Sequence, residues 1–210
     1  MKITRIKQSC FIIESESGTI IIIDPYQIPE GTVKADIVLT THDHPDHYDA
    51  GSLARIKKDE TIVVCPASCK KIIKKWNARG LAVGETLDAA GITIKAVPAY
   101  NKKKPFHSRG KHYLGYIMSI DEKSLYHAGD TDFIEEMKDI HSPDVAFIPI
   151  GGFFTMSAGD AIEAIKVIKP VTLIPMHEIK QDLAAFAAEV QSEVPDVKVC
   201  ALQAGESMTI

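Results

Sequence analysis

The sequence predicts an α/β protein in which two β-sheets pack together and helices cover their outer faces, an αββα four-layer sandwich. Both halves of the chain contain short β-branched segments followed by amphipathic helical segments. The 210 residues, 45% of them hydrophobic, suffice for one substantial core. No repeat, low-complexity tract or linker rich in Gly, Pro and Ser interrupts the chain. Residues 1–210 are therefore expected to form a single domain.

The first half of the chain begins with strands alone and continues with strands that alternate with helices. Alternating segments separated by polar turns predict an antiparallel meander over residues 2–8, 10–15 and 19–24. Short apolar runs then predict buried strands at 36–41 and 61–65. Each is followed by a helical pattern, at 50–58 and at 67–78, and Ala67 or Ser68 lies near the start of the second helix.

The second half repeats this change from paired strands to alternating strands and helices. Residues 85–100 predict paired strands, and residues 113–129 predict a hairpin that turns at Asp121 and Glu122. A polar loop lies between them, at 101–112. The remaining predicted elements are a strand at 144–150, a helix at 157–169, a strand at 171–176, a helix at 179–191 and a strand at 197–202.

Composition narrows the classes of partner. The formal net charge is −4, so no global field attracts nucleic acid or an anionic membrane. The longest apolar runs are far shorter than the roughly 20 residues of a membrane span, and the N-terminus does not resemble a targeting segment. A soluble cytoplasmic protein with no membrane partner is the expectation. The four cysteines are scattered and are expected to be buried thiols.

The segment HDHPDH at residues 42–47 follows the predicted strand at 36–41. Five of its six positions carry imidazole or carboxylate groups, namely His42, Asp43, His44, Asp46 and His47. Such side chains suit zinc, manganese or iron, and loops at strand ends are where α/β folds place their chemistry. A solvated surface turn is the alternative, but so many metal-capable groups rarely cluster beside a buried strand without a ligand. The segment therefore predicts a site for two metal ions.

The segment matches the His-x-His-x-Asp-His signature of the metallo-β-lactamase superfamily. The order of further segments strengthens this resemblance: IIIDP precedes the signature, and YHAGDTDF and LIPMHE follow it. The GGFFTM segment is similar to one in small metal-dependent hydrolases that resemble L-ascorbate-6-phosphate lactonase. The resemblance covers nearly the whole chain and implies an αββα sandwich of the metallo-β-lactamase type.

The resemblance also implies how the signature binds metal. In the family, the first two histidines bind one ion, and the aspartate and last histidine bind a second. Carried over, His42 and His44 hold the first ion, while Asp46 and His47 hold the second. Asp43 occupies a variable position and is expected to support the ligands rather than bind metal.

Two further ligands are implied by the later segments. Asp130 would bridge both ions, and His177 would complete the second site. The implied cofactors are two divalent metal ions, with zinc expected and manganese or iron as alternatives.

One expected ligand departs from the family pattern. A histidine normally follows the strand before the polar loop, but VPAYN places Asn101 at that position. His107, six residues later, is the favoured replacement, because two imidazoles and a bridging carboxylate alone would bind the first ion weakly. In a second interpretation, Asn101 is a weak ligand and only one strong metal site is left. In a third, His107 is a solvated loop residue that binds no metal.

Two other histidines are not expected to bind metal. His127 precedes Asp130 by three residues at the end of a predicted strand, where a histidine more often orients a ligand or packs in the core. His141 lies between a helix and a strand and is expected to be exposed.

Such a site predicts hydrolysis. Bound metal lowers the pKa of water from 15.7 to about 7, which supplies hydroxide at neutral pH. By resemblance, Asp46 is the expected catalytic residue, because it can orient this water or move its proton. The chain has no G-x-S-x-G segment, and no separate nucleophile is needed. The expected enzyme is a metal-dependent hydrolase acting on an ester, lactone or phosphodiester bond.

The expected substrate is a small anionic molecule. The loop at 101–112 carries five basic residues, Lys102, Lys103, Lys104, Arg109 and Lys111, although a merely solvated loop is an equal alternative. Phe153 and Phe154 could line an apolar pocket or simply pack in the core.

The signature segment is also compatible with two other functions. A nuclease or phosphodiesterase acting on nucleic acid would share the signature, but no long basic insertion is present, so nucleic acid is not the expected partner. A non-catalytic metal-binding protein is the alternative if Asn101 has degraded the first site. The resemblance also allows a homo-oligomer, because family members often associate.

Overall fold

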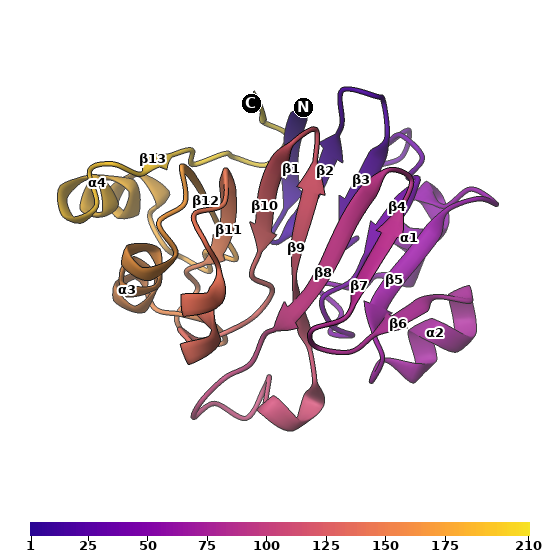
Figure 1. The fold of residues 1–210 in the computed structure, drawn as a ribbon, viewed down its shortest axis with the longest axis horizontal. Helices are drawn as coiled ribbons and strands as arrows, with labels where there is room; N and C mark the ends of the chain where they lie inside the picture. The colour runs from indigo at the N-terminus through magenta and orange to yellow at the C-terminus, as the bar shows by residue number, and fades with distance from the viewer.

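The computed structural model describes residues 1–210, and two seven-stranded sheets pack face to face within it (Figure 1). In spatial order, the first sheet consists of β14 (Ser207–Thr209), β1 (Lys2–Lys7), β2 (Cys10–Glu14), β3 (Ile20–Ile23), β4 (Ile37–Leu39), β5 (Ile62–Pro66) and β6 (Arg79–Leu81). The second consists of β13 (Lys198–Val199), β12 (Thr172–Met176), β11 (Val145–Pro149), β10 (Lys123–His127), β9 (Leu114–Ile120), β8 (Ile92–Pro98) and β7 (Thr86–Ala89).

Helices cover the outer faces of both sheets (Figure 1). The helices α1 (Ala50–Ile56) and α2 (Lys70–Trp76) lie beside the first sheet, and α3 (Ala158–Ile168) and α4 (Leu183–Glu193) lie beside the second. Two short 3-10 turns, η1 (Arg109–Lys111) and η2 (Glu135–Asp139), interrupt the loops. The predicted αββα sandwich is thereby confirmed.

Alternation along the strands builds the core between the sheets. In β8, Ile92, Ile94 and Ala96 are buried in this core, whereas the intervening Thr93 and Lys95 are exposed, as expected for strands with one face inward. A second, smaller apolar cluster lies beneath α1 and α2. The helices therefore bury the outer face of the first sheet separately from the main core.

Strand direction brings the loops that carry the signature together. The strands β1, β2 and β3 form the predicted antiparallel meander, and β3, β4, β5 and β6 then run parallel. In the second sheet, β10, β11 and β12 are also parallel. Loops after parallel strands leave the same edge of a sheet, so the segments after β3, β4, β10 and β12 can share one site.

Several predicted boundaries are wrong, each for a local reason. The helix α4 begins at Leu183 rather than at residue 179, because the Asp182 side chain caps it by accepting hydrogen bonds from two backbone N–H groups. Cys69, and neither Ala67 nor Ser68, is the N-cap of α2. The last predicted strand shrinks to β13, while β6 and β14 were not expected. None of the helices combines the length and the apolar character needed to cross a membrane.

Candidate metal centre

The loop after β4 is fixed by a buried carboxylate directly after the neighbouring strand β3. Oδ1 of Asp24 accepts a hydrogen bond from the backbone N–H of Thr41 at 2.7 Å, and Oδ2 accepts one from the Thr41 hydroxyl at 2.8 Å. Oδ2 also lies 2.7 Å from Nδ1 of His47. Asp24 is fully buried, so these contacts replace its hydration. The carboxylate thus holds both ends of the signature loop and orients the His47 ring.

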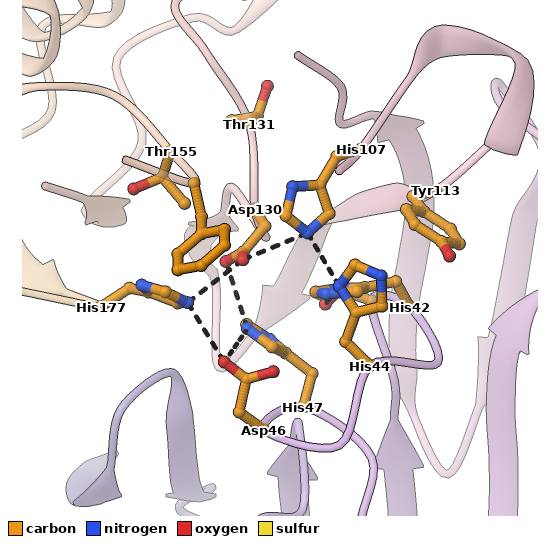
Figure 2. A network of polar contacts seen from close by, with 12 residues as sticks. His42, His44, Asp46, His47, His107, Tyr113, Asp130, Thr131, Thr155 and His177 are labelled. Atoms are coloured by element: carbon orange, nitrogen blue, oxygen red, sulfur yellow. Dashed lines mark hydrogen bonds and ion pairs between the residues drawn. The ribbon is translucent and has the colours of Figure 1, made fainter. Parts of the chain in front are cut away.

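All seven residues predicted to bind metal lie together (Figure 2). Three overlapping groups have their donor atoms within 4.8 Å of one another: His42, His44 and His107; His42, His47 and Asp130; and Asp46, His47 and His177. The side chains come from four different segments, and most of them are buried. The structure therefore brings every predicted site residue to one place, at the edge of the two sheets.

Asn101 holds His107 in place. The Asn101 side-chain amide donates to Oδ1 of Asp132 at 3.1 Å and to the carbonyl of Phe154 at 2.9 Å, so its oxygen faces His107. That oxygen lies 3.0 Å from Nδ1 of His107, which therefore donates the hydrogen bond. Nε2 is left without a proton in the neutral ring and lies 3.1 Å from Nδ1 of His44.

Asp130 lies between His107 on one side and His47 and His177 on the other (Figure 2). Its Oδ2 is 3.4 Å from Nε2 of His107 and 3.1 Å from Nε2 of His177. Its Oδ1 is 3.2 Å from Nε2 of His47. One carboxylate therefore faces both halves of the cluster.

His177 follows β12 in a constrained backbone conformation. Its φ is 52°, and the facing residue is Gly151. A Cβ atom on Gly151 would lie 2.4 Å from the His177 carbonyl oxygen and 3.2 Å from its Nδ1, closer than side chains approach. Only glycine therefore fits beside His177. The Nε2 atom of His177 faces Asp130 and lies 3.5 Å from Oδ2 of Asp46.

A model of the beta-lactamase superfamily domain matches residues 2–177. The chain belongs to this superfamily. A relative from Archaeoglobus fulgidus is 31% identical over 230 residues, covering 99% of this chain and 98% of the relative. Another, from Pelotomaculum thermopropionicum, is 35% identical over 234 residues and covers all of both chains. Each is named UPF0173 metal-dependent hydrolase.

The superfamily assignment extends to solved structures. Igni18, a metallo hydrolase from the hyperthermophilic archaeon Ignicoccus hospitalis, is similar with a TM-score of 0.83 at 29% identity, covering 99% of this chain and 97% of Igni18. The expected fold of the metallo-β-lactamase type and the expected class of enzyme, a metal-dependent hydrolase, are confirmed.

The buried polar atoms of this superfamily member fit a metal. Nε2 of His42, Nε2 of His47 and Oδ1 of Asp130 are buried and have no hydrogen-bond partner. Nε2 of His47 and Oδ1 of Asp130 lie 3.2 Å apart but are not aligned for a hydrogen bond. A buried polar atom without a partner costs about 1 to 3 kcal/mol. A cation contacting these atoms would remove that cost, and imidazole with carboxylate is the donor set that divalent metals prefer.

The histidines fall into two electrostatic classes. Burial lowers the pKa of His107 to about 4, and burial also lowers the pKa of His42 well below its usual value. These two rings are neutral at pH 7 and are ready to bind metal. Burial also opposes charge on His177, but the nearby Asp130 outweighs it and raises the pKa of His177 to about 9. For His47, Asp130 and Asp24 likewise raise the pKa despite burial.

Three supporting residues were not predicted from sequence. Asp24 lies within the IIIDP segment, but nothing in that segment alone indicates that its carboxylate reaches His47. Gln8 donates from Nε2 to Oδ2 of Asp46 at 2.8 Å, and no motif marks it. The Tyr113 hydroxyl donates to Oδ1 of Asp43 at 2.7 Å. This contact places Asp43 outside the donor groups, as expected.

His127 and His141 lie where they were expected. His127 is buried against Phe11 and Phe147, and its Nε2 donates to the carbonyl of Ser9 at 3.1 Å. Its Nδ1 accepts a hydrogen bond at 3.3 Å from the backbone N–H of Gly129, next to Asp130. His127 thus orders the loop that carries Asp130. His141 is exposed.

The basic loop near His107 is partly neutralised. Nζ of Lys104 lies 2.6 Å from Oδ1 of Asp132, and Arg109 lies 2.9 Å from Oε1 of Glu136. Lys102, Lys103 and Lys111 have no ion-pair partner. Phe106 of this loop packs with Phe153 and Phe154, and the ring centroids lie 4.7 to 5.5 Å apart. The surroundings of His107 therefore combine free positive charge with an aromatic cluster.

Proposed function

We propose that the chain hydrolyses an ester, lactone or phosphodiester bond in a small anionic molecule, with two divalent metal ions, most simply zinc, as cofactors. The observation that carries the proposal is the position of Asp130, whose two carboxylate oxygens face histidines from both donor groups. A single carboxylate between two sets of imidazoles is an arrangement that suits a pair of ions.

The residues divide between the two ions. His42, His44 and His107 would hold the first ion, Asp46, His47 and His177 would hold the second, and Asp130 would contact both. When bound, two such ions would lower the pKa of water to about 7 and would polarise the bond to be cleaved. Asp24 and Asn101 contribute by orienting the rings of His47 and His107.

Asp46 is the proposed catalytic residue. Its side chain is 37% exposed, whereas Asp130 and the neighbouring His47 are buried, so Asp46 is the carboxylate that an incoming water can reach. Burial opposes its ionisation, but His177 and His47 together lower the pKa of Asp46 to about 2. A carboxylate with so low a pKa accepts hydrogen bonds rather than protons at pH 7. Asp46 is therefore suited to orienting the attacking water, and Gln8 holds it in position.

The side chains near His107 favour a small anionic substrate. Lys102 and Lys103 carry charge with no carboxylate within ion-pair distance, and Lys103 is exposed. Unpaired positive charge beside a metal centre attracts anions. The aromatic cluster of Phe106, Phe153 and Phe154 offers an apolar contact to the rest of the substrate.

A cytoplasmic location and a homo-oligomer stay predictions from the sequence.

Metal stoichiometry tests the first part of the proposal. The protein reconstituted with zinc, desalted and measured by mass spectrometry of the metal, is expected to hold two ions per chain. His107→Ala should lose or weaken one ion, whereas His112→Ala, a change at an exposed histidine of the same loop, should retain both. One ion or none in the unmodified protein would contradict the dinuclear site.

Activity tests the second part. The zinc-loaded protein is assayed against a p-nitrophenyl ester, a simple lactone and bis(p-nitrophenyl) phosphate. Asp46→Asn should lower the turnover of any substrate that is cleaved by about 100-fold, as expected when a group that orients a reactant is lost. Asp43→Asn, a change in the neighbouring exposed carboxylate, should have a small effect. Equal activity in the two variants would contradict the role of Asp46.

A further inference from the structure

The outer face of the second sheet contains a cavity that is separate from the metal centre. Its volume is about 430 Å³, and it is lined mainly by apolar residues. None of the seven candidate metal ligands lines it. Its volume lies within the roughly 300 to 1,000 Å³ of pockets that bind small molecules.

Strand register and the turn η2 build this cavity. Lys95 of β8 pairs with Ile117 of β9, which pairs with Tyr126 of β10, so the three side chains lie on one face of the sheet. Their neighbours in sequence point the other way, into the core between the sheets. The opposite wall comes from η2 and its flanks, through Met137 and Ile140. The cavity therefore lies between the sheet and a short turn, with no helix filling it.

Tyr126 lines the cavity, and among the tyrosines of the lining only its hydroxyl has no hydrogen-bond partner. Its side chain is fully buried, and its hydroxyl has no hydrogen-bond partner. By contrast, the other large buried tyrosine, Tyr116, donates its hydroxyl to the carbonyl of Thr40 at 2.8 Å. Burial raises the pKa of Tyr126, so the hydroxyl keeps its proton at neutral pH and can donate. A buried hydroxyl without a partner is costly, and a bound molecule could satisfy it.

The charged residues that line the cavity do not favour a charged ligand. Arg109 is paired with Glu136 at 2.9 Å, and the Tyr100 hydroxyl also donates to Glu136 at 2.9 Å. The remaining charged residues of the lining, Lys95 and Asp139, have opposite signs. Because the interior is apolar and the charges around it are balanced, burying an ion there would be unfavourable.

We propose that this cavity binds a small, neutral, largely apolar molecule that carries one hydroxyl or carbonyl group, and that this group pairs with the hydroxyl of Tyr126. The apolar walls would contact the body of the molecule, and Tyr126 would fix its orientation. The cavity shares Tyr100 and Arg109 with the segment that carries Asn101 and His107. The bound molecule would therefore contact the segment that carries His107, without entering the metal centre.

A pair of probes tests the role of the hydroxyl. The dissociation constants of 2-naphthol and naphthalene are measured by fluorescence titration of the full chain and of Tyr126→Phe. This substitution removes only a hydroxyl that has no partner in the protein, so the fold should be retained. The preference for 2-naphthol over naphthalene is expected to fall about 5- to 10-fold in the variant, as for the loss of one hydrogen bond. An unchanged preference would overturn the assignment of Tyr126.

Occlusion of the cavity tests its location. Val97 lines the cavity from β8, and Val97→Trp should weaken the binding of both probes at least 10-fold. Val33→Trp is the matched control, because Val33 is 51% exposed and lies outside the cavity, and this variant should bind as the unmodified protein does. Circular dichroism checks that both variants fold. Equal binding by the two variants, or no binding of either probe by the unmodified protein up to its solubility limit, would overturn the proposal.

Discussion

Asn101 orients the ring of His107 through a hydrogen bond of 3.0 Å between its amide oxygen and Nδ1. The resemblance led us to expect a histidine at position 101, but the structure shows Asn101 there, hydrogen-bonded to a histidine six residues later. The bond fixes the tautomer, which leaves Nε2 free to face His44 and Asp130. Asn101 thus orients His107, which lies with His42 and His44, and Asn101 is not itself one of the candidate metal ligands.

Removing this hydrogen bond should weaken metal binding without abolishing it. In Asn101→Ala, the His107 ring loses its orienting acceptor, so the affinity of the first ion should fall by about 10- to 100-fold. Competition with a fluorescent zinc chelator measures the affinity. Lys103→Ala, a change at an exposed residue of the same loop, is the control and should leave it unchanged. If Asn101→Ala bound both ions as tightly as the unmodified protein, the orienting role would be wrong.

Replacing Asp24 should destabilise the metal-free protein. Its carboxylate accepts from Thr41 and lies against Nδ1 of His47 in a fully buried position. The amide nitrogen of Asp24→Asn cannot accept, so one contact is lost and the charge that balances His47 disappears. The free energy of unfolding should fall by about 3 kcal/mol, as when one partner of a buried pair is removed. Urea denaturation measures it, with the exposed Asp59→Asn expected to change it by less than about 0.5 kcal/mol.

Two glycine substitutions should have opposite effects on stability. In Gly151→Ala the new Cβ would meet the His177 carbonyl at 2.4 Å, so the backbone must shift, at a cost of about 1 to 3 kcal/mol. The second ion should also bind more weakly. Gly159 lies in α3 with open space around it, so Gly159→Ala should stabilise by about 0.5 to 1 kcal/mol. Thermal denaturation compares the two, and an equal shift in both would contradict the close approach at His177.

Metal binding should release a proton from His177 but not from His107. At pH 7 His107 is neutral, with a pKa of about 4, whereas His177 is protonated, with a pKa of about 9. An ion bound by His177 must displace that proton. Proton release should therefore be present at pH 7 and should decline as the pH rises through about 9. Calorimetric titration of the metal-free protein in buffers of different ionisation enthalpy measures it, and release that increases toward pH 10 would contradict these pKa values.

The sequence predicted the layers of the fold and the seven clustered donors because both depend on local patterns. Strand alternation and the signature segment are each readable within a few residues. The supporting contacts were not predictable in this way. Gln8 and Asp46 are separated by 38 positions, and Arg5 is buried where it pairs with Glu178, next to His177. Such pairs depend on which strands and loops the fold brings together, which no local pattern encodes.

The chain order of the donors has a consequence for synthesis. His42, His44, Asp46 and His47 leave the ribosome early, but Asp130 and His177 come much later, and β14 pairs with β1 only when residues 207–209 are available. Domains are made at about 5 to 20 residues per second, so the early histidines wait several seconds for their partners. During that interval the nascent chain presents an incomplete binding site. The seven side chains can therefore come together only when synthesis of the chain is nearly complete.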